Sequence, residues 1–541
     1  MSSTSAIALA AIALSTAVSG SAQREGLNRI RIDDLRADLT FLASDALEGR
    51  RSLERGSEVA IQFLVAEFAK AGIKPAYGDF YLQPVPLIEY RMDQGLTSLA
   101  IARGVTRQTL KYNADFFGGS PFELSVDASV VFAGYGITAP EFGYDDYAAV
   151  DARGKIVLLF EHEPQENDPH SIFNGIGNTR HANSLVKILN AQKHGAVGVL
   201  LVSEPNRRHS SNQERTARIP GGEQRARRLP PQALADGEIS IPSFSISDAL
   251  AVDLLAATGK KPSELQSAID VSLKPASQPL PDTSASMRTA LEERRRGTSY
   301  NVVGLVEGID PVLKNETIVF SAHYDHDGAW DGNIRHGADD NGSGTVGVLE
   351  LARAFAASPV KPKRSLLFAI FAAEERGLLG SYYYVAHPLR PLETTRAVIN
   401  FDMIGRNETP SKQTEGLIQI APDTSNELNL IGTINSPAYR TVVEGANEHV
   451  GLHLNYKWDD DAALNIFQRS DQFPFSLREI PAIWWFTGFH PDYHQTSDTV
   501  EKINFAKMEK ILRLAYLTGW DFASAASTPG FVARPATGGS R

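Results

Sequence analysis

The stretch Ser365–Phe371 reads SLLFAIF, an unbroken apolar run of the length of a β-strand. Such a run is typical of a strand that is covered on both faces, as in a parallel sheet. The sequence around it alternates between strand-like and helical patterns. Strands are expected at 317–321, 398–402 and 482–486, and helices at 344–357 and 501–526. This alternation predicts an α/β sandwich whose mostly parallel central sheet is flanked by helices.

The first half of the chain has a different pattern. After a helical stretch at 35–72, short β-type runs dominate, with one helical segment between them. A stretch rich in arginine follows at 203–237, which we interpret as a solvated loop, and a Pro/Ser-rich connector follows at 274–298. The sequence therefore predicts a second, β-rich unit. Its strands are expected at 128–133, 155–160, 197–202 and 241–246, and its helix at 184–194.

Composition excludes several classes of function. The 541 residues carry a formal net charge of −11, which argues against nucleic acid as a partner because binding phosphates requires clustered cations. The chain contains no cysteine, so disulfides and thiolate chemistry are excluded. Any metal ion must therefore be held by histidine, aspartate and glutamate.

The N-terminus resembles an export signal. The apolar stretch Ala6–Val18 is too short to span a bilayer but suits the core of a signal peptide, and Gly20 and Ala22 are small residues suited to cleavage before Gln23. We therefore expect a signal peptide at 1–22 and a periplasmic or secreted protein. The remaining sequence predicts no integral membrane segment.

Polar residues with metal-binding chemistry cluster at the ends of the predicted strands. The carboxyl ends of strands are where open α/β sheets bind their ligands, so these residues are expected to lie together. They are His323-Tyr-Asp325, the glycine-rich turn Gly337–Gly344 (GADDNGSG), Glu374-Glu375, Asp402 and His494.

Taken together and in this order, these motifs resemble those of the M28 family of zinc exopeptidases. The neighbouring sequences ERGLLGS at 375–381 and NFDMIG at 400–405 are similar to the family pattern as well. The segment between the matching parts resembles a protease-associated (PA) domain, through KIVLL at 155–159 and GAVGVL at 195–200. The resemblance implies a zinc-exopeptidase sandwich with an inserted β-rich PA domain.

The resemblance also implies a division of the chain into domains. These are a signal peptide at 1–22, the first part of the catalytic domain at 23–118, the PA-like insert at 119–275, a linker at 276–297, the second part of the catalytic domain with the metal site at 298–526, and a disordered tail at 527–541.

By the same resemblance, five side chains would bind two zinc ions. Asp339 would bridge both ions, His323 and Asp402 would complete one site, and Glu375 and His494 would complete the other. Such ligands suit a catalytic zinc site, which uses His nitrogen and carboxylate oxygen and leaves a position open for water.

Two further carboxylates receive catalytic roles from the resemblance. Glu374 would act as the general base, and Asp325 would accept a hydrogen bond from His323 and orient its ring. The Asp339–Asp340 peptide bond would be cis.

The implied activity is removal of residues from peptides that have a free N-terminus. Three alternatives remain open: a single-zinc glutaminyl cyclase on the same fold, a PA-domain receptor without activity, and a carboxypeptidase or dipeptidase of the same clan. The cyclase keeps fewer ligands, and a decayed receptor would lack some of them. The carboxypeptidase requires a cation for the substrate carboxylate, a role open to Arg406.

Overall fold

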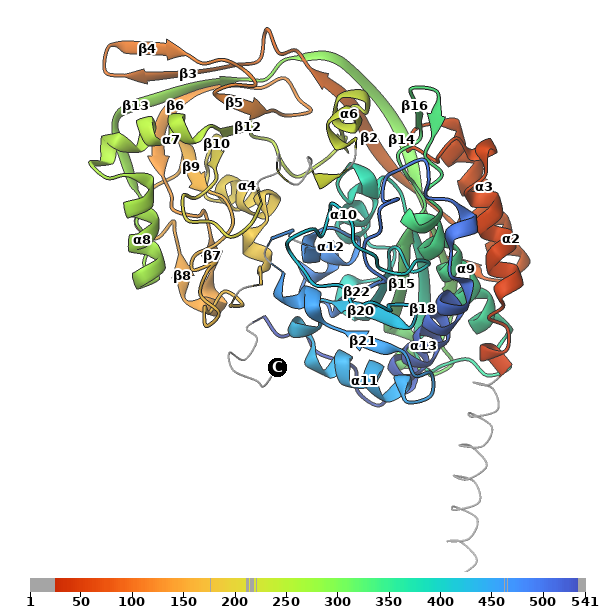
Figure 1. The fold of residues 1–541 in the computed structure, drawn as a ribbon. Helices are drawn as coiled ribbons and strands as arrows, with labels where there is room; N and C mark the ends of the chain where they lie inside the picture. Colours follow the sequence, from red (N-terminus) through yellow and green to blue (C-terminus); the bar gives the residue numbers. More distant parts are fainter. Residues whose placement is uncertain are drawn as a thin grey trace, which may run out of the picture.

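The computed structural model describes residues 25–175, 177–210, 214, 218–219, 221–461, 463–464 and 466–533. The predicted signal peptide and residues 534–541 lie outside these ranges. The molecule has two lobes, each built on its own sheet, and long strands run between them (Figure 1). No helix in the described ranges has the length and apolar character needed to cross a membrane.

The larger sheet confirms the predicted α/β class. Its four central strands are parallel and match the predicted apolar runs, while antiparallel strands extend both edges. A further short strand, β1 (Lys74–Pro75), pairs with β14. The order is β11 (Gln232–Leu234), β2 (Leu82–Met92), β14 (Leu291–Val306), β18 (Ser365–Phe371), β15 (Thr317–His323), β19 (Thr395–Phe401), β22 (Ala482–Phe486), β20 (Glu427–Ile431) and β21 (His453–Asn455).

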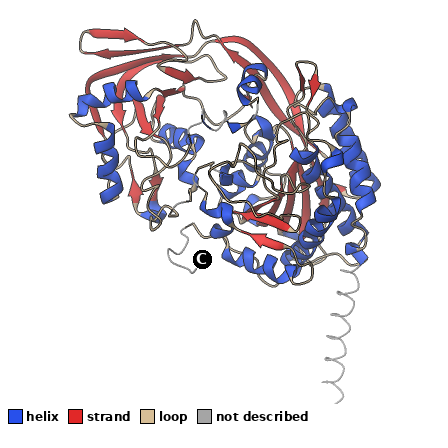
Figure 2. Ribbon diagram, in the orientation of Figure 1, coloured by secondary structure: helices blue, strands red, loops and turns tan. Residues whose placement is uncertain are grey.

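Helices cover both faces of this sheet, as Figure 2 shows. Because alternate residues of a strand point to opposite faces, Ile318 and Phe320 of β15 join one core while Val319 joins the other. The helices on the first face are α2 (Ile32–Leu42), α3 (Arg55–Lys70), α9 (Gly344–Ala357), α11 (Pro437–Asn447) and α13 (Phe505–Ser524), and those on the second are α10 (Leu379–Ala386) and α12 (Gln472–Ser476).

The smaller lobe confirms the predicted β-rich unit. Its two main cores lie on the two faces of its sheet, with Leu158 of β9 in one and Leu159 in the other. The sheet order is β4 (Thr106–Thr109), β3 (Ser98–Arg103), β13 (Gln278–Arg288), β6 (Ser125–Phe132), β9 (Ile156–Phe160), β10 (Gly198–Val202), β12 (Ser243–Ile246) and β5 (Phe116–Gly118). Its helices are α4 (Ser184–Lys193), α7 (Asp248–Leu255) and α8 (Pro262–Ser272).

Two-residue strands form hairpins outside the main sheets, namely β7 (Thr138–Ala139) with β8 (Tyr144–Asp145) and β16 (Ala329–Trp330) with β17 (Asn333–Ile334).

The predicted domain boundaries require correction. The linker predicted at 276–297 is β13 and the first part of β14, and three strands placed in the catalytic domain, β3, β4 and β5, belong to the smaller sheet. The Pro/Ser-rich composition hid the strand, because the residues buried along β13 include Thr283 and Ala285, which carry little of the hydrophobic signal that predicts a strand. The two lobes are therefore joined by the paired strands β2 and β14.

The predicted disordered tail is wrong for its first residues. The Val532 amide donates to the Asn435 carbonyl at 2.7 Å, and Ser436 Oγ donates to the Gly530 carbonyl at 3.0 Å. The segment thus continues along the surface next to α11.

Candidate metal centre

The predicted site residues converge at one edge of the large sheet. His323 is the last residue of β15, Glu374 and Glu375 follow β18, and Asp402 follows β19. His494 lies in the loop after β22. Since β15, β18, β19 and β22 are parallel neighbours, their carboxyl ends bring these side chains to the same edge.

The shared carboxylate at this edge belongs to Asp340, which corrects the expectation for Asp339. Oxygens of Asp340 lie within two groups of candidate ligands, one with His323 and Asp402 and one with His326, Glu375 and His494. The cis peptide bond is likewise Asp340–Asn341 and not Asp339–Asp340.

The Asp339 side chain points away from both groups and holds the turn. Its Oδ1 accepts from the Gly405 amide at 2.7 Å and from Ser343 Oγ at 3.0 Å, and its Oδ2 lies 3.2 Å from His490 Nε2. Asp498 fixes the same turn by accepting from the amides of Asp339 and Asp340 at 3.0 and 3.1 Å. The side chains of Asp339 and Asp340 point in different directions, so the turn directs only one of the two aspartates, Asp340, at the ligand groups.

The first group is formed by His323, Asp340 and Asp402. His323 Nε2 lies 3.6 Å from Asp340 Oδ1 and 3.5 Å from Asp402 Oδ1. The Ser470 hydroxyl donates to the other oxygen of Asp402 at 2.6 Å and orients that carboxylate. All three candidate ligands are buried.

The second group contains Asp340, Glu375, His494 and a histidine that the sequence analysis left out. His494 Nε2 lies 3.5 Å from Asp340 Oδ2 and 3.7 Å from Glu375 Oε2. The additional residue is His326, whose Nδ1 lies 2.7 Å from Glu375 Oε1 and 3.9 Å from Asp340 Oδ2.

These distances suit ligands arranged around zinc. Zinc bonds of about 2.0–2.1 Å in a tetrahedral site place neighbouring ligand atoms about 3.3–3.4 Å apart. In the described part of the chain, the buried His323 Nε2, which faces the first group, has no hydrogen-bond partner. Burial and the nearby carboxylates of Glu375 and Asp402 raise the pKa of Asp340 well above its usual range. A site so crowded with carboxylates fits divalent cations.

Glu374 lies beside the first group and belongs to neither. Its Oε2 is 3.7 Å from His323 Nε2, and its side chain is almost fully buried. Burial raises its pKa well above the usual range, and the carboxylates of Asp402 and Glu375 add to the rise. A carboxylate with a raised pKa next to an ion site is suited to accept a proton near neutral pH.

Asp325 contacts His323 mainly through its main-chain carbonyl, whereas the sequence analysis expected the contact to be made by its carboxylate. His323 Nδ1 lies 3.1 Å from the Asp325 main-chain carbonyl and 3.7 Å from its carboxylate. The carboxylate accepts from the Glu374 amide at 3.0 Å. Asp325 therefore orients both the histidine and the loop that carries Glu374.

Asp327 is a positioning residue that the sequence analysis missed. Its Oδ2 lies 2.8 Å from His494 Nδ1, an arrangement that leaves His494 Nε2 directed at the second group. Arg376 Nη2 donates to its Oδ1 at 2.7 Å. The sequence feature that could have indicated this role is the position of Asp327 in the segment His323-Tyr-Asp-His-Asp327, at the carboxyl end of β15.

Arg225 is an exception to the interpretation of the arginine-rich stretch as solvated, which exposed residues such as Arg208 and Arg228 fit. Arg225 lies on α6 (Gly222–Arg228), next to β11, which pairs with β2 of the large sheet. Its Nε donates to Asp327 at 2.6 Å and its Nη2 donates to Glu375 at 2.7 Å. Part of the insert sequence thus reaches the centre. Arg225 and Glu375 are 150 residues apart in the sequence, so local sequence patterns could not predict their contact.

The fold and these side chains define a candidate two-ion centre on an α/β scaffold. Residues 301–518 match the model of Peptidase family M28, and residues 126–254 match that of the PA domain. The chain is therefore similar to M28 peptidases over residues 301–518 and to PA domains over residues 126–254.

Similar proteins include known aminopeptidases. "Leucine aminopeptidase 2" of Arthroderma otae is 30% identical over 268 residues, which cover 44% of this chain and 48% of that protein. "Aminopeptidase YwaD" of Bacillus subtilis is 31% identical over 227 residues, covering 39% of this chain and 42% of that one. The match thus spans about half of these relatives or less. The solved aminopeptidase from Aneurinibacillus sp. strain AM-1 is 20% identical, with 95% of this chain and 98% of that chain covered and a TM-score of 0.49.

Proposed function

We propose that this protein is a two-zinc aminopeptidase that cleaves the first peptide bond of peptides with a free N-terminus. The observation that carries the proposal is the placement of Asp340 between two groups of histidines and carboxylates. The similarity to named aminopeptidases supports it.

Five side chains would hold the ions. His323 and Asp402 would bind one, Glu375 and His494 would bind the other, and Asp340 would bind both. His326 would support the second site through its contact with Glu375. When bound, a pair of zinc ions about 3.5–4 Å apart supplies Lewis-acid activation of a water molecule and of the scissile carbonyl.

Glu374 would act first as the general base and then as the general acid. Its carboxylate accepts a proton from the attacking water and then donates it to the leaving amine, so the peptide bond breaks without forming a free amide anion. The Asp325 carboxylate accepts from the Glu374 amide and keeps the loop in place during both transfers.

A cavity of about 460 Å³ beside this loop supports access for a peptide. Gly377, Leu378 and Tyr382 line it from the catalytic domain, and Ser184 and Leu185 line it from the insert. A peptide bound in this cavity would touch both lobes, so the insert would contribute to the selection of peptides.

A carboxypeptidase is the second candidate, because Arg225 places a cation at the centre. Arg406, the residue considered from the sequence, is engaged with Asp492 at 2.8 Å. Arg225 is engaged as well, by Asp327 and Glu375, which favours the aminopeptidase.

Cleavage of leucine anilide and of its N-acetylated form by the zinc-loaded protein tests the proposal. We expect hydrolysis of the free amine only, and loss of that activity on treatment with a chelator. Hydrolysis of N-acylated dipeptides at their C-terminal residue, without cleavage of the anilide, would establish the carboxypeptidase instead.

A further inference from the structure

A second cluster of histidines and glutamates is buried in the insert, outside the centre described above. His162 and Glu166 lie in the segment after β9, and Glu204 and His209 lie in the segment after β10. β9 and β10 are parallel neighbours, so their carboxyl ends bring the four side chains together. Each of the four is at most 5% exposed.

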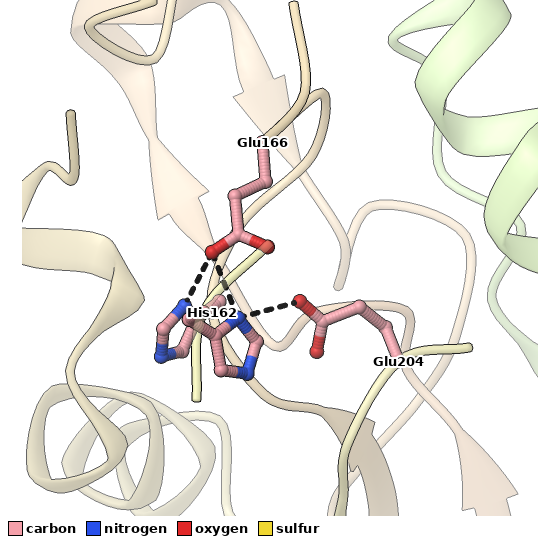
Figure 3. Close-up of side chains that lie close together, drawn as sticks. His162, Glu166 and Glu204 are labelled. Atoms are coloured by element: carbon pink, nitrogen blue, oxygen red, sulfur yellow. Dashed lines mark hydrogen bonds and ion pairs between the residues drawn. The ribbon is translucent and has the colours of Figure 1, made fainter. Parts of the chain in front are cut away.

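The nitrogens and oxygens of the cluster point toward one another, as Figure 3 shows for His162, Glu166 and Glu204. His162 Nδ1 and His209 Nδ1 lie 2.9 and 2.7 Å from the same oxygen, Glu166 Oε1. Glu204 Oε1 lies 3.4 Å from His209 Nδ1. One atom from each of the four side chains falls within 4.8 Å of the others, the spacing of ligands around a single ion.

Hydrogen bonding alone does not satisfy this cluster. Among the described residues, neither carboxylate oxygen of Glu204 has a hydrogen-bond partner, although the side chain is fully buried. Burial and the charge of Glu166 raise the pKa of Glu204 well above its usual range. The ammonium of the buried Lys187 donates to the Tyr135 carbonyl and not to Glu204, and its charge offsets only part of this rise in the pKa. An isolated buried carboxylate is costly unless a cation neutralises it.

We propose that His162, Glu166, Glu204 and His209 bind a divalent cation, zinc, as a structural site of the insert. Two imidazole nitrogens and two carboxylate oxygens complete the tetrahedral shell that structural zinc prefers. The two glutamates balance the charge of the ion. The segments after β9 and β10 would be tied together at the side of the insert that faces the catalytic lobe, where Glu161 and His162 line the cavity.

The metal content of the full-length protein tests this site. The double variant Glu204→Gln/His209→Gln and the wild type are loaded with zinc, dialysed and counted by elemental mass spectrometry. The double variant is expected to hold one zinc fewer per chain. The difference does not depend on how many ions the catalytic lobe holds. Equal zinc contents in two folded proteins would overturn the proposal.

The matched control is His181→Gln. His181 is a buried histidine of the same insert that lies 2.9 Å from one carboxylate, Glu141, and belongs to none of the candidate ligand groups formed by the described residues. Its zinc content is expected to equal that of the wild type. If the double variant fails to fold, anomalous diffraction at the zinc edge from wild-type crystals decides: a peak among the four side chains supports the site, and none in zinc-loaded crystals overturns it.

Discussion

The two clusters use the same kind of scaffold for different tasks. Both lie at the carboxyl ends of neighbouring parallel strands. In the catalytic lobe one carboxylate, Asp340, is shared by two groups, and Glu374 stands beside them without belonging to either. In the insert the four side chains of the cluster form one closed group. On the functions proposed above, the difference has a physical reason: the catalytic centre would need a carboxylate that is free to move a proton, whereas the structural site would commit each of its ligands to the ion.

Among the variants that keep their zinc, the largest expected effect comes from removing that free carboxylate. Glu374→Gln keeps the size of the side chain but removes its basicity, so kcat should fall by about 10²–10⁴-fold with a smaller change in KM. The zinc content should stay at the wild-type level, because Glu374 belongs to neither ligand group. Steady-state kinetics together with zinc analysis check both expectations.

Glu375→Gln is the matched comparison, since it changes the adjacent residue in the same way. Glu375 belongs to the second group, so this variant should lose zinc together with activity. If instead Glu374→Gln lost zinc while Glu375→Gln kept it, the two roles would be exchanged.

A smaller effect is expected from Asp327→Asn. Asp327 lies 2.8 Å from His494 Nδ1 and orients that ring, and loss of such a supporting contact typically weakens metal binding by about 10–100-fold. Titration of the metal-free protein with zinc should show one weakened site and one site close to normal. Equal weakening of both sites would show that Asp327 acts on the whole centre.

The smallest effect is expected from Arg225→Met. The arginine contacts Asp327 and Glu375 but none of the three candidate ligands of the first group. Arg376 and His494 would remain on Asp327 and the proposed ion would remain on Glu375, so neither buried carboxylate would lose all of its partners, and kcat/KM for an aminoacyl anilide should change by less than about tenfold. Complete loss of activity would favour recognition of a substrate carboxylate by Arg225.

The sequence predicts the central sheet well, because continuous apolar runs such as Ser365–Phe371 leave a strand no exposed face. It also places most of the metal centre, since the ligands follow those strands directly. The strand within the Pro/Ser-rich segment at 276–297 was missed because its prolines argue against a strand and its buried residues include the weakly apolar Thr283 and Ala285.

The finer assignments depend on information that local sequence does not contain. The backbone angles of one turn decide whether Asp339 or Asp340 faces the candidate ligand groups. In this turn Asp340 has φ −100° and ψ 98°. The roles of Asp327 and Arg225 depend on contacts across 167 and 150 residues, with His494 and Glu375 respectively. The first pairing forms within the lobe of the large sheet, and the second joins the predicted insert sequence to it.

The zinc contents of Asp340→Asn and Asp339→Asn, measured side by side, test the central claim most directly. Both substitutions remove one charge within the same turn, so each controls for the other. The account predicts that Asp340→Asn holds two zinc ions fewer than the wild type and has no measurable activity, whereas Asp339→Asn retains the wild-type zinc content. Loss of both ions in Asp339→Asn, with retention in Asp340→Asn, would contradict the assignment of Asp340 as the shared ligand.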